Sequence, residues 1–308
     1  MPISSPPELG GLRIASLLPS ATEIVLALGR EESLVAVSHS CDFPGRVEAL
    51  PRVTRTRVPK DAASREIDAV VRECLERGES LYQIEVELLD RLRPDLVVTQ
   101  ALCEVCAVGP DEVGRAVPAL RTKPRVLTLE PRTLDGAFDT ILEVGHAIER
   151  RERAARLVGD LRRRVDAVRA RTPGRTSRPR VAFLEWADPP ICGGHWNPEL
   201  VHLAGGCDGL GRPGEPIRTV EWEEVLDWRP QVLVLACCGF TAERSRAELA
   251  LLRERPGYDR LPCARSGRVH VMDCVGHFSR PGPSLVESLE VLERVMLERR
   301  SSGGARVA

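Results

Sequence analysis

Cysteine and histidine are the side chains of this sequence with the most distinctive chemistry, and many of them follow stretches that read as β-strands. The sequence holds ten cysteines and six histidines. Five segments after expected strands each hold two of them: His39 and Cys41, Cys103 and Cys106, Cys192 and His195, Cys237 and Cys238, and Cys274 and His277. Ligands bind outside the carboxyl ends of the strands in open α/β sheets, so these segments are expected to face one cleft.

Thiolates and imidazoles gathered at such a cleft suit zinc or iron–sulfur chemistry, and an imidazole can also be an axial ligand of a metal in a macrocycle. The Cys-x-x-Cys spacing makes one pair the expected core of a metal site. The expected ligand set is Cys103 and Cys106, with Cys41, Cys238 or His277 completing it. Free cysteine also packs as a small hydrophobe, so packing residues are the alternative.

The same loops also fit a flat organic ligand. Trp186 and Trp196 flank Gly193-Gly194, and two tryptophans in one loop can form an apolar wall for a planar molecule. The residues expected to line the ligand cleft are Pro19, Ser20, Glu23, Cys41, Asp42, Gln100, Trp186, His195, Trp196, Phe240, His277 and Phe278.

Two series of strands and helices are expected to position these loops. Residues 12–18 form a short apolar run that ends at Pro19, and the following helix is expected to be capped by Ser20 or Thr22 and to end at Gly29. The other strands expected are 34–39, 96–99 and 125–129 in the first half, and 180–186, 231–236 and 268–272 in the second.

A long helical pattern separates the two halves. Residues 133–171 contain no proline, and their apolar residues recur at helical spacing. One continuous helix over this range would be about 57 Å long, more than one lobe needs, so it is expected to bridge two lobes. The predicted fold is α/β, with a lobe at 1–132, a bridging helix at 133–173, and a second lobe at 174–308 that ends in a disordered tail.

Composition narrows the functional classes. The chain has 44 basic and 45 acidic residues and a net charge of −1, which gives no reason to expect binding to nucleic acid or an anionic membrane. No stretch is long and apolar enough for membrane insertion. The first eleven residues lack the pattern of a secretory signal, and the cysteines suit a reducing compartment, so a cytoplasmic location is expected. The absence of common catalytic motifs favours binding over catalysis.

Several segments together resemble a known family. They are LRIASLLPSATEIVLALG from residue 12, LVAVSHSCDFP from 34, RLRPDLVVTQ from 91, the long helix, and NPELVHLAGG from 197. The chain resembles the cobalamin-binding members of the substrate-binding proteins of metal-chelate ABC transporters, which are helical-backbone metal receptors. The resemblance covers residues 12–299 and implies two Rossmann-like lobes joined by one rigid helix, with cobalamin, another corrinoid or a related metal chelate held between them.

The resemblance also assigns a docking role to one glutamate of each lobe, through which exported members contact the membrane permease. Glu23 matches the first position, and His202 occupies the second. The resemblance therefore implies a cytoplasmic relative whose docking on an ABC permease is in question.

Three functions remain open on the sequence alone. A binding protein for a corrinoid or metal chelate accounts for the two lobes and the tryptophans. A protein or enzyme with cysteine-bound zinc or an iron–sulfur centre accounts for the thiols. A structural or regulatory module that has lost its ligand is the third.

Overall fold

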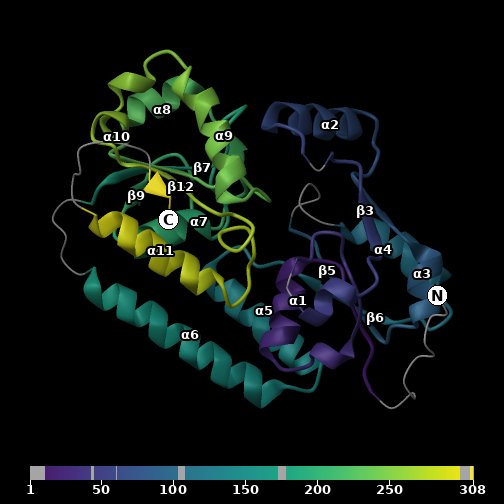
Figure 1. Cartoon of the computed structure of the whole chain (residues 1–308). Coiled ribbons are helices and arrows are strands. Elements are labelled where there is room, and N and C mark those ends of the chain that lie inside the picture. The colour runs from purple at the N-terminus through teal and green to yellow at the C-terminus, as the bar shows by residue number, and fades with distance from the viewer. Residues whose placement is uncertain are drawn as a thin grey trace.

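The first lobe is built on a parallel four-stranded sheet. The computed structural model describes residues 11–42, 45–59, 61–102, 108–172, 178–298 and 306–307 (Figure 1). The sheet has the order β2 (Leu34–Val37), β1 (Ile14–Ser16), β5 (Leu96–Gln100) and β6 (Arg125–Leu129), with all pairs parallel. Its two central strands are fully buried, as expected for apolar runs that are covered on both faces.

Helices cover both faces of this sheet, and a small ribbon extends from it. The helices are α1 (Pro19–Ala27), α2 (Ser64–Glu76), α3 (Val86–Leu92) and α4 (Pro110–Ala116), and the ribbon pairs β3 (Thr54–Thr56) with β4 (Tyr82–Ile84). Short 3₁₀ turns lie at Glu31–Ser33, Gly45–Ala49 and Val117–Ala119. The expected cap of α1 is wrong: the helix begins at Pro19 with Leu18 as its cap, so Ser20 and Thr22 lie inside the first turn. Proline suits that first position because its missing N–H would have no helical partner there.

The second lobe repeats the arrangement around a larger sheet. The sheet has the order β10 (Arg218–Thr219), β8 (Ile191–Cys192), β7 (Arg180–Trp186), β11 (Val232–Leu235), β12 (Val269–Val271) and β13 (Arg306–Val307), and β9 (Cys207–Asp208) also pairs with β7. Its helices are α7 (Asn197–Leu203), α8 (Trp222–Trp228), α9 (Ala242–Arg253), α10 (Pro262–Arg265) and α11 (Leu285–Leu297), with a 3₁₀ turn at Tyr258–Arg260. Of the predicted tail, 306–307 pair with β12, and 301–305 and 308 lie outside the described residues.

Two helices, rather than one, connect the lobes. They are α5 (Leu134–Ala147) and α6 (Arg151–Arg171), and Glu149 between them has the left-handed φ of 60°. The helices run antiparallel, because Gly145 of α5 lies against Ala154, and Asp135 lies 3.1 Å from Arg162 in an ion pair. The prediction of a bridging helix is confirmed, but not as one rod over 133–171: the helical spacing of apolar residues continues across the turn and hides it.

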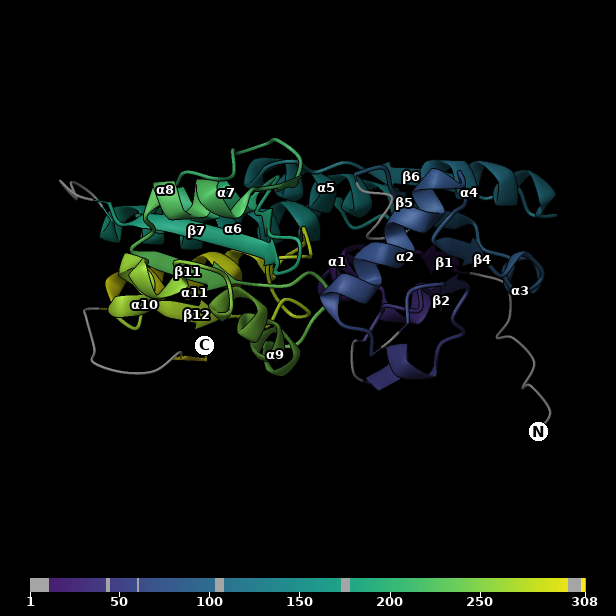
Figure 2. The same ribbon diagram turned by 90° about the horizontal axis from the view of Figure 1, so that it is seen from above.

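The bridge itself is α6, which is about 32 Å long at 1.5 Å per residue. Near its start Arg153 donates to the carbonyl of Ala27 in the first lobe, at 3.1 Å. Near its end, Arg171 pairs with Glu293 of α11 in the second lobe, at 2.7 Å. Figure 2 shows the two sheets side by side, with α6 behind the second. The predicted two-lobed α/β fold is thus confirmed, whereas the predicted lobe limits at 132 and 173 stay a prediction.

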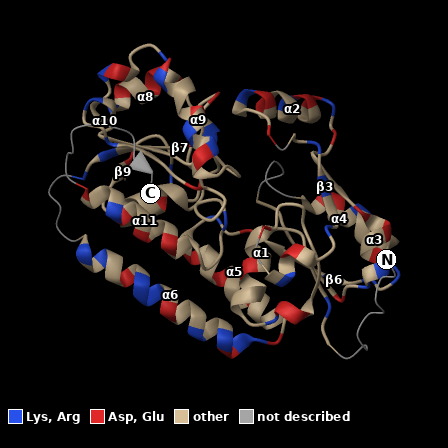
Figure 3. Ribbon diagram, in the orientation of Figure 1, with Lys and Arg blue, Asp and Glu red and all other residues tan. Residues whose placement is uncertain are grey.

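Arginines follow the outer face of α6 (Figure 3). Most have a carboxylate close by: Arg164 pairs with Glu290 at 2.8 Å, and Arg169 with Asp166 at 3.5 Å. Pairs on an exposed helix face contribute little to stability, so we assign this face no function. None of the helices in the described part of the chain is both long and apolar enough to cross a membrane.

Candidate functional site

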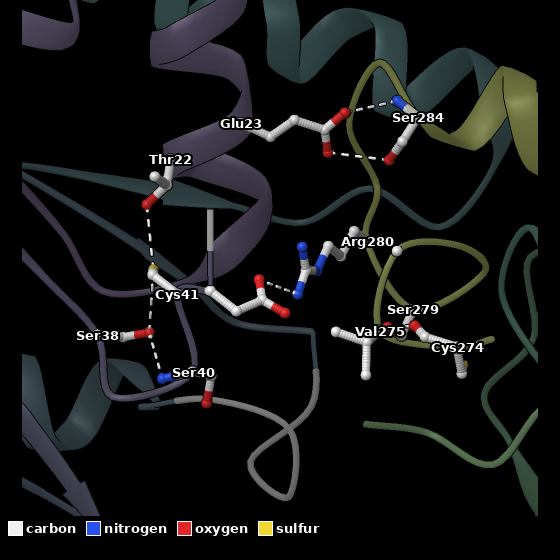
Figure 4. A network of polar contacts seen from close by, with 12 residues as sticks. Thr22, Glu23, Ser38, Ser40, Cys41, Cys274, Val275, Ser279, Arg280 and Ser284 are labelled. Carbon is white, nitrogen blue, oxygen red and sulfur yellow. Dashed lines mark hydrogen bonds and ion pairs between the residues drawn. The ribbon is translucent and has the colours of Figure 1, made fainter. Parts of the chain in front are cut away.

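The loops that follow β1 and β12 bring the two lobes into direct contact. Glu23, on α1, accepts two hydrogen bonds from Ser284, at the start of α11: one from the backbone N–H at 2.6 Å and one from the hydroxyl at 3.0 Å (Figure 4). Burial raises the pKa of the Glu23 carboxyl, and the bonds from Ser284 partly oppose this rise. A Cβ at Gly282 would lie 2.6 Å from Glu23 Oε2, so glycine leaves the space that the carboxylate occupies.

An ion pair joins the lobes beside this contact. Asp42, in the loop after β2, lies 2.6 Å from the guanidinium of Arg280, in the loop after β12 (Figure 4). Arg280 is only 9% exposed, whereas Asp42 is at the surface. The segment with the expected binding residues of the first lobe therefore contacts the corresponding segment of the second.

Cys41 is held by hydroxyl groups. Its sulfur lies 3.2 Å from Thr22 Oγ1 and 3.3 Å from Ser38 Oγ, and Thr22 also donates to Ser16 at 2.8 Å. Cys41 is 1% exposed. The side chains of Thr22 and Cys41, 19 positions apart in the chain, thus belong to one polar cluster of the first lobe.

A second contact between the lobes lies at α2 and α9, which are neighbours in both Figure 1 and Figure 2. Glu248 of α9, 6% exposed, accepts bonds from the backbone N–H of Ser64, at 3.2 Å, and from its hydroxyl. Arg244 of α9 donates to the carbonyl of Ala62. We call these four residues the α2–α9 contact.

The aromatic residues expected to form a ligand wall are packed inside the second lobe. Trp186 meets Phe240 at a ring separation of 5.1 Å, and Trp196 donates its indole N–H to the carbonyl of Phe278 at 2.6 Å. All four are less than 9% exposed. The adjacent Gly194 has a packing role, because a Cβ there would collide with the backbone at 216–217.

Three further expected residues of the first lobe lie near the strand ends. Pro19 is the first residue of α1, Ser20 is 3% exposed in the first turn, and Gln100 is 7% exposed at the end of β5. Two hollows that described residues line are found elsewhere. One of about 210 Å³ adjoins Tyr258 and Arg265, and one of about 100 Å³ lies where α5, α6 and α7 meet.

Two histidines of the second lobe differ in the surroundings of their rings. His195 is 8% exposed, has a φ of 51°, and has its pKa lowered by burial and by the charge of Arg132. His277 follows β12 in the loop that also carries Arg280. Its Nδ1 atom is buried and has no hydrogen-bond partner among the described residues.

The expected thiol ligand set lies only partly within the described residues. Cys103 and Cys106 lie outside them. In the part of the chain that is described, no three His, Cys, Asp or Glu side chains are placed to hold a metal ion. Cys41 contacts hydroxyl groups instead, and Cys238 is half-buried. Cysteine-bound zinc or iron–sulfur stays a prediction.

Sequence reasoning missed two carboxyls of the second lobe, those of Glu185 and Asp208. Glu185 of β7 accepts bonds from the side-chain amide of Asn197, at 2.9 Å, and from the N–H of Gly194, at 3.0 Å. Burial raises its pKa to about 7, and burial raises the pKa of Asp208 to about 7 as well. The signal that was available is a glutamate inside the otherwise apolar run VAFLEW.

The positions that the resemblance assigns to permease docking are arranged differently in the two lobes. Glu23 is turned toward Ser284, as described above. His202 is exposed on α7, where Arg178 Nη1 lies 2.9 Å from its Nδ1, and both burial and the charge of Arg178 lower its pKa.

Comparisons with known proteins agree with this architecture. The family model described as periplasmic binding protein matches residues 14–274. A vitamin B12-binding protein of Vibrio cholerae is 26% identical over 281 residues, covering 90% of this chain and 86% of the relative. One of Yersinia pestis is 25% identical over 240 residues, covering 75% and 71%.

Solved structures show the same fold. The periplasmic vitamin B12 binding protein of Vibrio cholerae matches with a TM-score of 0.65 and 23% identity, covering 92% of this chain and 96% of that one. A periplasmic heme binding protein of Pseudomonas aeruginosa matches with a TM-score of 0.71 and 22% identity, covering 92% of both chains.

These matches overturn the expected cytoplasmic location. The matching family and the similar solved structures are periplasmic binding proteins, which points to the periplasm. The expectation rested on what the first residues lack and on the number of thiols. Neither observation outweighs a family match over residues 14–274.

Proposed function

Because the chain belongs to the periplasmic binding protein family, we propose that it is the substrate-binding component of an ABC importer and that its cargo is cobalamin or a closely related corrinoid. The sequence relatives support the choice of cargo, since the vitamin B12-binding protein of Vibrio cholerae aligns with 90% of this chain. The heme-binding structures are under 25% identical and support the fold only.

The observation that carries the proposal is the meeting of strand-exit loops from both lobes. Asp42 and Arg280 face each other there at 2.6 Å, beside the bonds between Glu23 and Ser284. A corrin ring carries amide groups around its edge, which donate to carboxylates and accept from a guanidinium. Polar groups from opposite lobes are therefore available to hold such an edge once the loops separate.

Separation is required because the loops touch directly in this structure. Charged groups that pair at 2.6 Å leave no space for a planar ligand between them. We propose that the cargo replaces the pair of Asp42 with Arg280, so that each side chain exchanges a protein partner for a ligand amide. Such an exchange costs less than burying either charge without a partner.

His277 gives the proposed site a ligand for the metal. Its buried Nδ1 has no partner in the described residues, and it lies three residues before Arg280. A neutral imidazole is a suitable axial ligand for cobalt in a macrocycle. The proposed role of His277 is therefore to occupy one axial position of the bound corrinoid.

A titration tests cargo and axial ligand together. Diaquocobinamide, a corrinoid with two exchangeable axial waters, is added to the purified protein while its visible spectrum and the tryptophan fluorescence are recorded. We expect saturable binding and a spectral shift toward imidazole coordination. The shift should be absent in His277→Ala and present in His146→Ala, whose imidazole lies on α5 away from the loops.

Two results of the titration would contradict parts of the proposal. Saturable binding of hemin, with no response to cobinamide or cyanocobalamin, would exclude a corrinoid cargo. Binding of cobinamide with the same spectral shift in wild type and His277→Ala would keep the cargo and remove the axial role of His277.

A further inference from the structure

The helix α2 is carried by the first lobe on an arm. The segments that flank the helix come together in the ribbon of β3 with β4, beside which the N–H of Arg57 donates to the carbonyl of Leu81 at 3.0 Å. In the second half of the helix, Val70, Val71 and Cys74 pack on an apolar core of the first lobe. The ribbon and these apolar contacts keep α2 with that lobe.

The first half of α2 contacts the second lobe instead, as its place beside α9 in Figure 1 and Figure 2 indicates. Ile67 packs on the apolar core of that lobe, to which Trp186 and Phe240 belong. Arg65 lies 2.6 Å from Asp188, in the loop after β7, in an ion pair. Together with the α2–α9 contact, these residues place the start of α2 across the boundary between the lobes.

The groups of the second lobe that hold α2 also have partners within their own lobe. Asp188 pairs with Arg255 at 3.0 Å. The guanidinium of Arg244 lies over the ring of Phe240, 3.5 Å from its centre. When α2 leaves, water replaces the lost hydrogen bonds at a net cost of about 1 kcal/mol each. The helix therefore separates more readily from the second lobe than from the first, where its contacts are apolar and its chain is continuous.

The α2–α9 contact joins two charged side chains to peptide groups. Glu248, 6% exposed, accepts the backbone N–H of Ser64 at 3.2 Å, and Arg244 donates to the backbone carbonyl of Ala62. Ser64 and Ala62 are themselves buried, so the contact excludes solvent. A primary amide offers the same two kinds of group, N–H donors and a carbonyl acceptor. The surface of α9 that binds the start of α2 therefore suits the side-chain amides of a corrin ring.

We propose that α2 is a lid, and that its start occupies a cargo-binding surface of the second lobe formed by Arg244 and Glu248. This inference rests on the proposed corrinoid cargo and adds how the site opens. Amide groups of the cargo take the places of the peptide groups of Ala62 and Ser64, and α2 moves away with the first lobe. Both side chains of α9 are satisfied in either state, so the exchange leaves no buried charge without a partner.

Hydrogen exchange of the full-length protein, with and without diaquocobinamide, tests the lid. The measurement is resolved to the amide of Ser64, whose N–H donates to Glu248. A ligand that bound beside a closed lid would slow this exchange, whereas displacement of α2 should accelerate it about tenfold or more. Slower or unchanged exchange at Ser64, while tryptophan fluorescence reports bound cobinamide, would overturn the lid.

Two variants remove the same hydrogen bond from opposite sides. Ser64→Ala weakens the closed lid and leaves the surface of α9 intact, so the affinity for cobinamide should rise about fivefold. Glu248→Ala also weakens the lid, but it removes a group that binds the cargo, so it should bring no such gain. Glu254→Gln, at the end of α9, is the control and should leave the affinity unchanged. An unchanged affinity in Ser64→Ala would contradict the lid, and equal gains in Ser64→Ala and Glu248→Ala would remove the cargo role of Glu248.

Failure of the proposed cargo gives a different result. If saturating diaquocobinamide changes neither the tryptophan fluorescence nor the hydrogen exchange of the wild type, the corrinoid cargo is wrong, and this role of α2 falls with it. Bound cobinamide without acceleration at Ser64 overturns the lid alone.

Discussion

Replacement of Glu185 by glutamine should flatten the pH dependence of stability. Glu185 Oε1 accepts bonds from Asn197 at 2.9 Å and from Gly194 at 3.0 Å, and a glutamine oxygen can accept both. Burial raises the pKa of the wild-type carboxyl from 4.5 to about 7. The substitution removes the titration while it keeps the shape and the acceptor atom.

The sign follows from which state holds the proton. Between pH 4.5 and about 7 the folded protein keeps the Glu185 proton, and the unfolded chain has released it. The contribution to stability is therefore full below pH 4.5 and is lost as the pH rises through about 7. One pKa unit corresponds to about 1.4 kcal/mol, so the whole effect is about 3 kcal/mol, of which about 2.5 kcal/mol falls between about pH 5 and about pH 8.

Equilibrium unfolding in urea at these two pH values measures the effect. The free energy of unfolding of Glu185→Gln should match that of the wild type at the lower pH and exceed it by about 2–3 kcal/mol at the higher pH. Burial also raises the pKa of Asp208 to about 7, so some pH dependence of the unfolding free energy remains in the variant. Glu143→Gln, on the exposed face of α5, is the matched control. If the unfolding free energy changed equally between the two pH values in wild type and Glu185→Gln, the reasoning would be refuted.

Two further substitutions test the contacts between the lobes. Glu248→Gln turns an amide toward the donors of Ser64, so hydrogen exchange at the start of α2 should accelerate about tenfold or more, and Glu254→Gln at the end of α9 should leave it unchanged. Gly282→Ala should displace the Glu23 carboxylate toward solvent, which lowers the pKa of this carboxyl, with little loss of folded stability. Carbon-13 NMR of the Glu23 side-chain carboxyl measures the pKa. An unchanged titration curve would contradict this prediction.

The strand exits were predictable because each is a local pattern. The apolar run at 12–18 ends at Pro19, and the structure has β1 followed directly by α1 there. Buried parallel strands need apolar side chains on both faces, so β5 and β11 were also clear in the sequence. The turn at Glu149 was hidden, since no glycine or proline marks its left-handed backbone.

The partners across the lobes could not be predicted. Glu23 and Ser284 are 261 positions apart, and nothing in either local sequence indicates the other. The burial of Trp186 and Trp196 was equally out of reach, because a tryptophan beside glycines fits both a ligand wall and a packed loop. The apolar pattern around Glu185 was visible, yet its raised pKa depends on neighbours that come from other segments.

The connections between the lobes are of two kinds, and the difference indicates how cargo can enter. Along α5, α6 and α11 the lobes share one continuous apolar core that includes Leu28, Ile148 and Leu289. At the strand exits and at the α2–α9 contact they meet through hydrogen bonds and ion pairs. Water can replace a polar contact at a net cost of about 1 kcal/mol each, whereas separating the apolar core exposes surface at about 25 cal/mol per Å². The lobes should therefore part at the strand exits and at α2 and α9, and turn about α6.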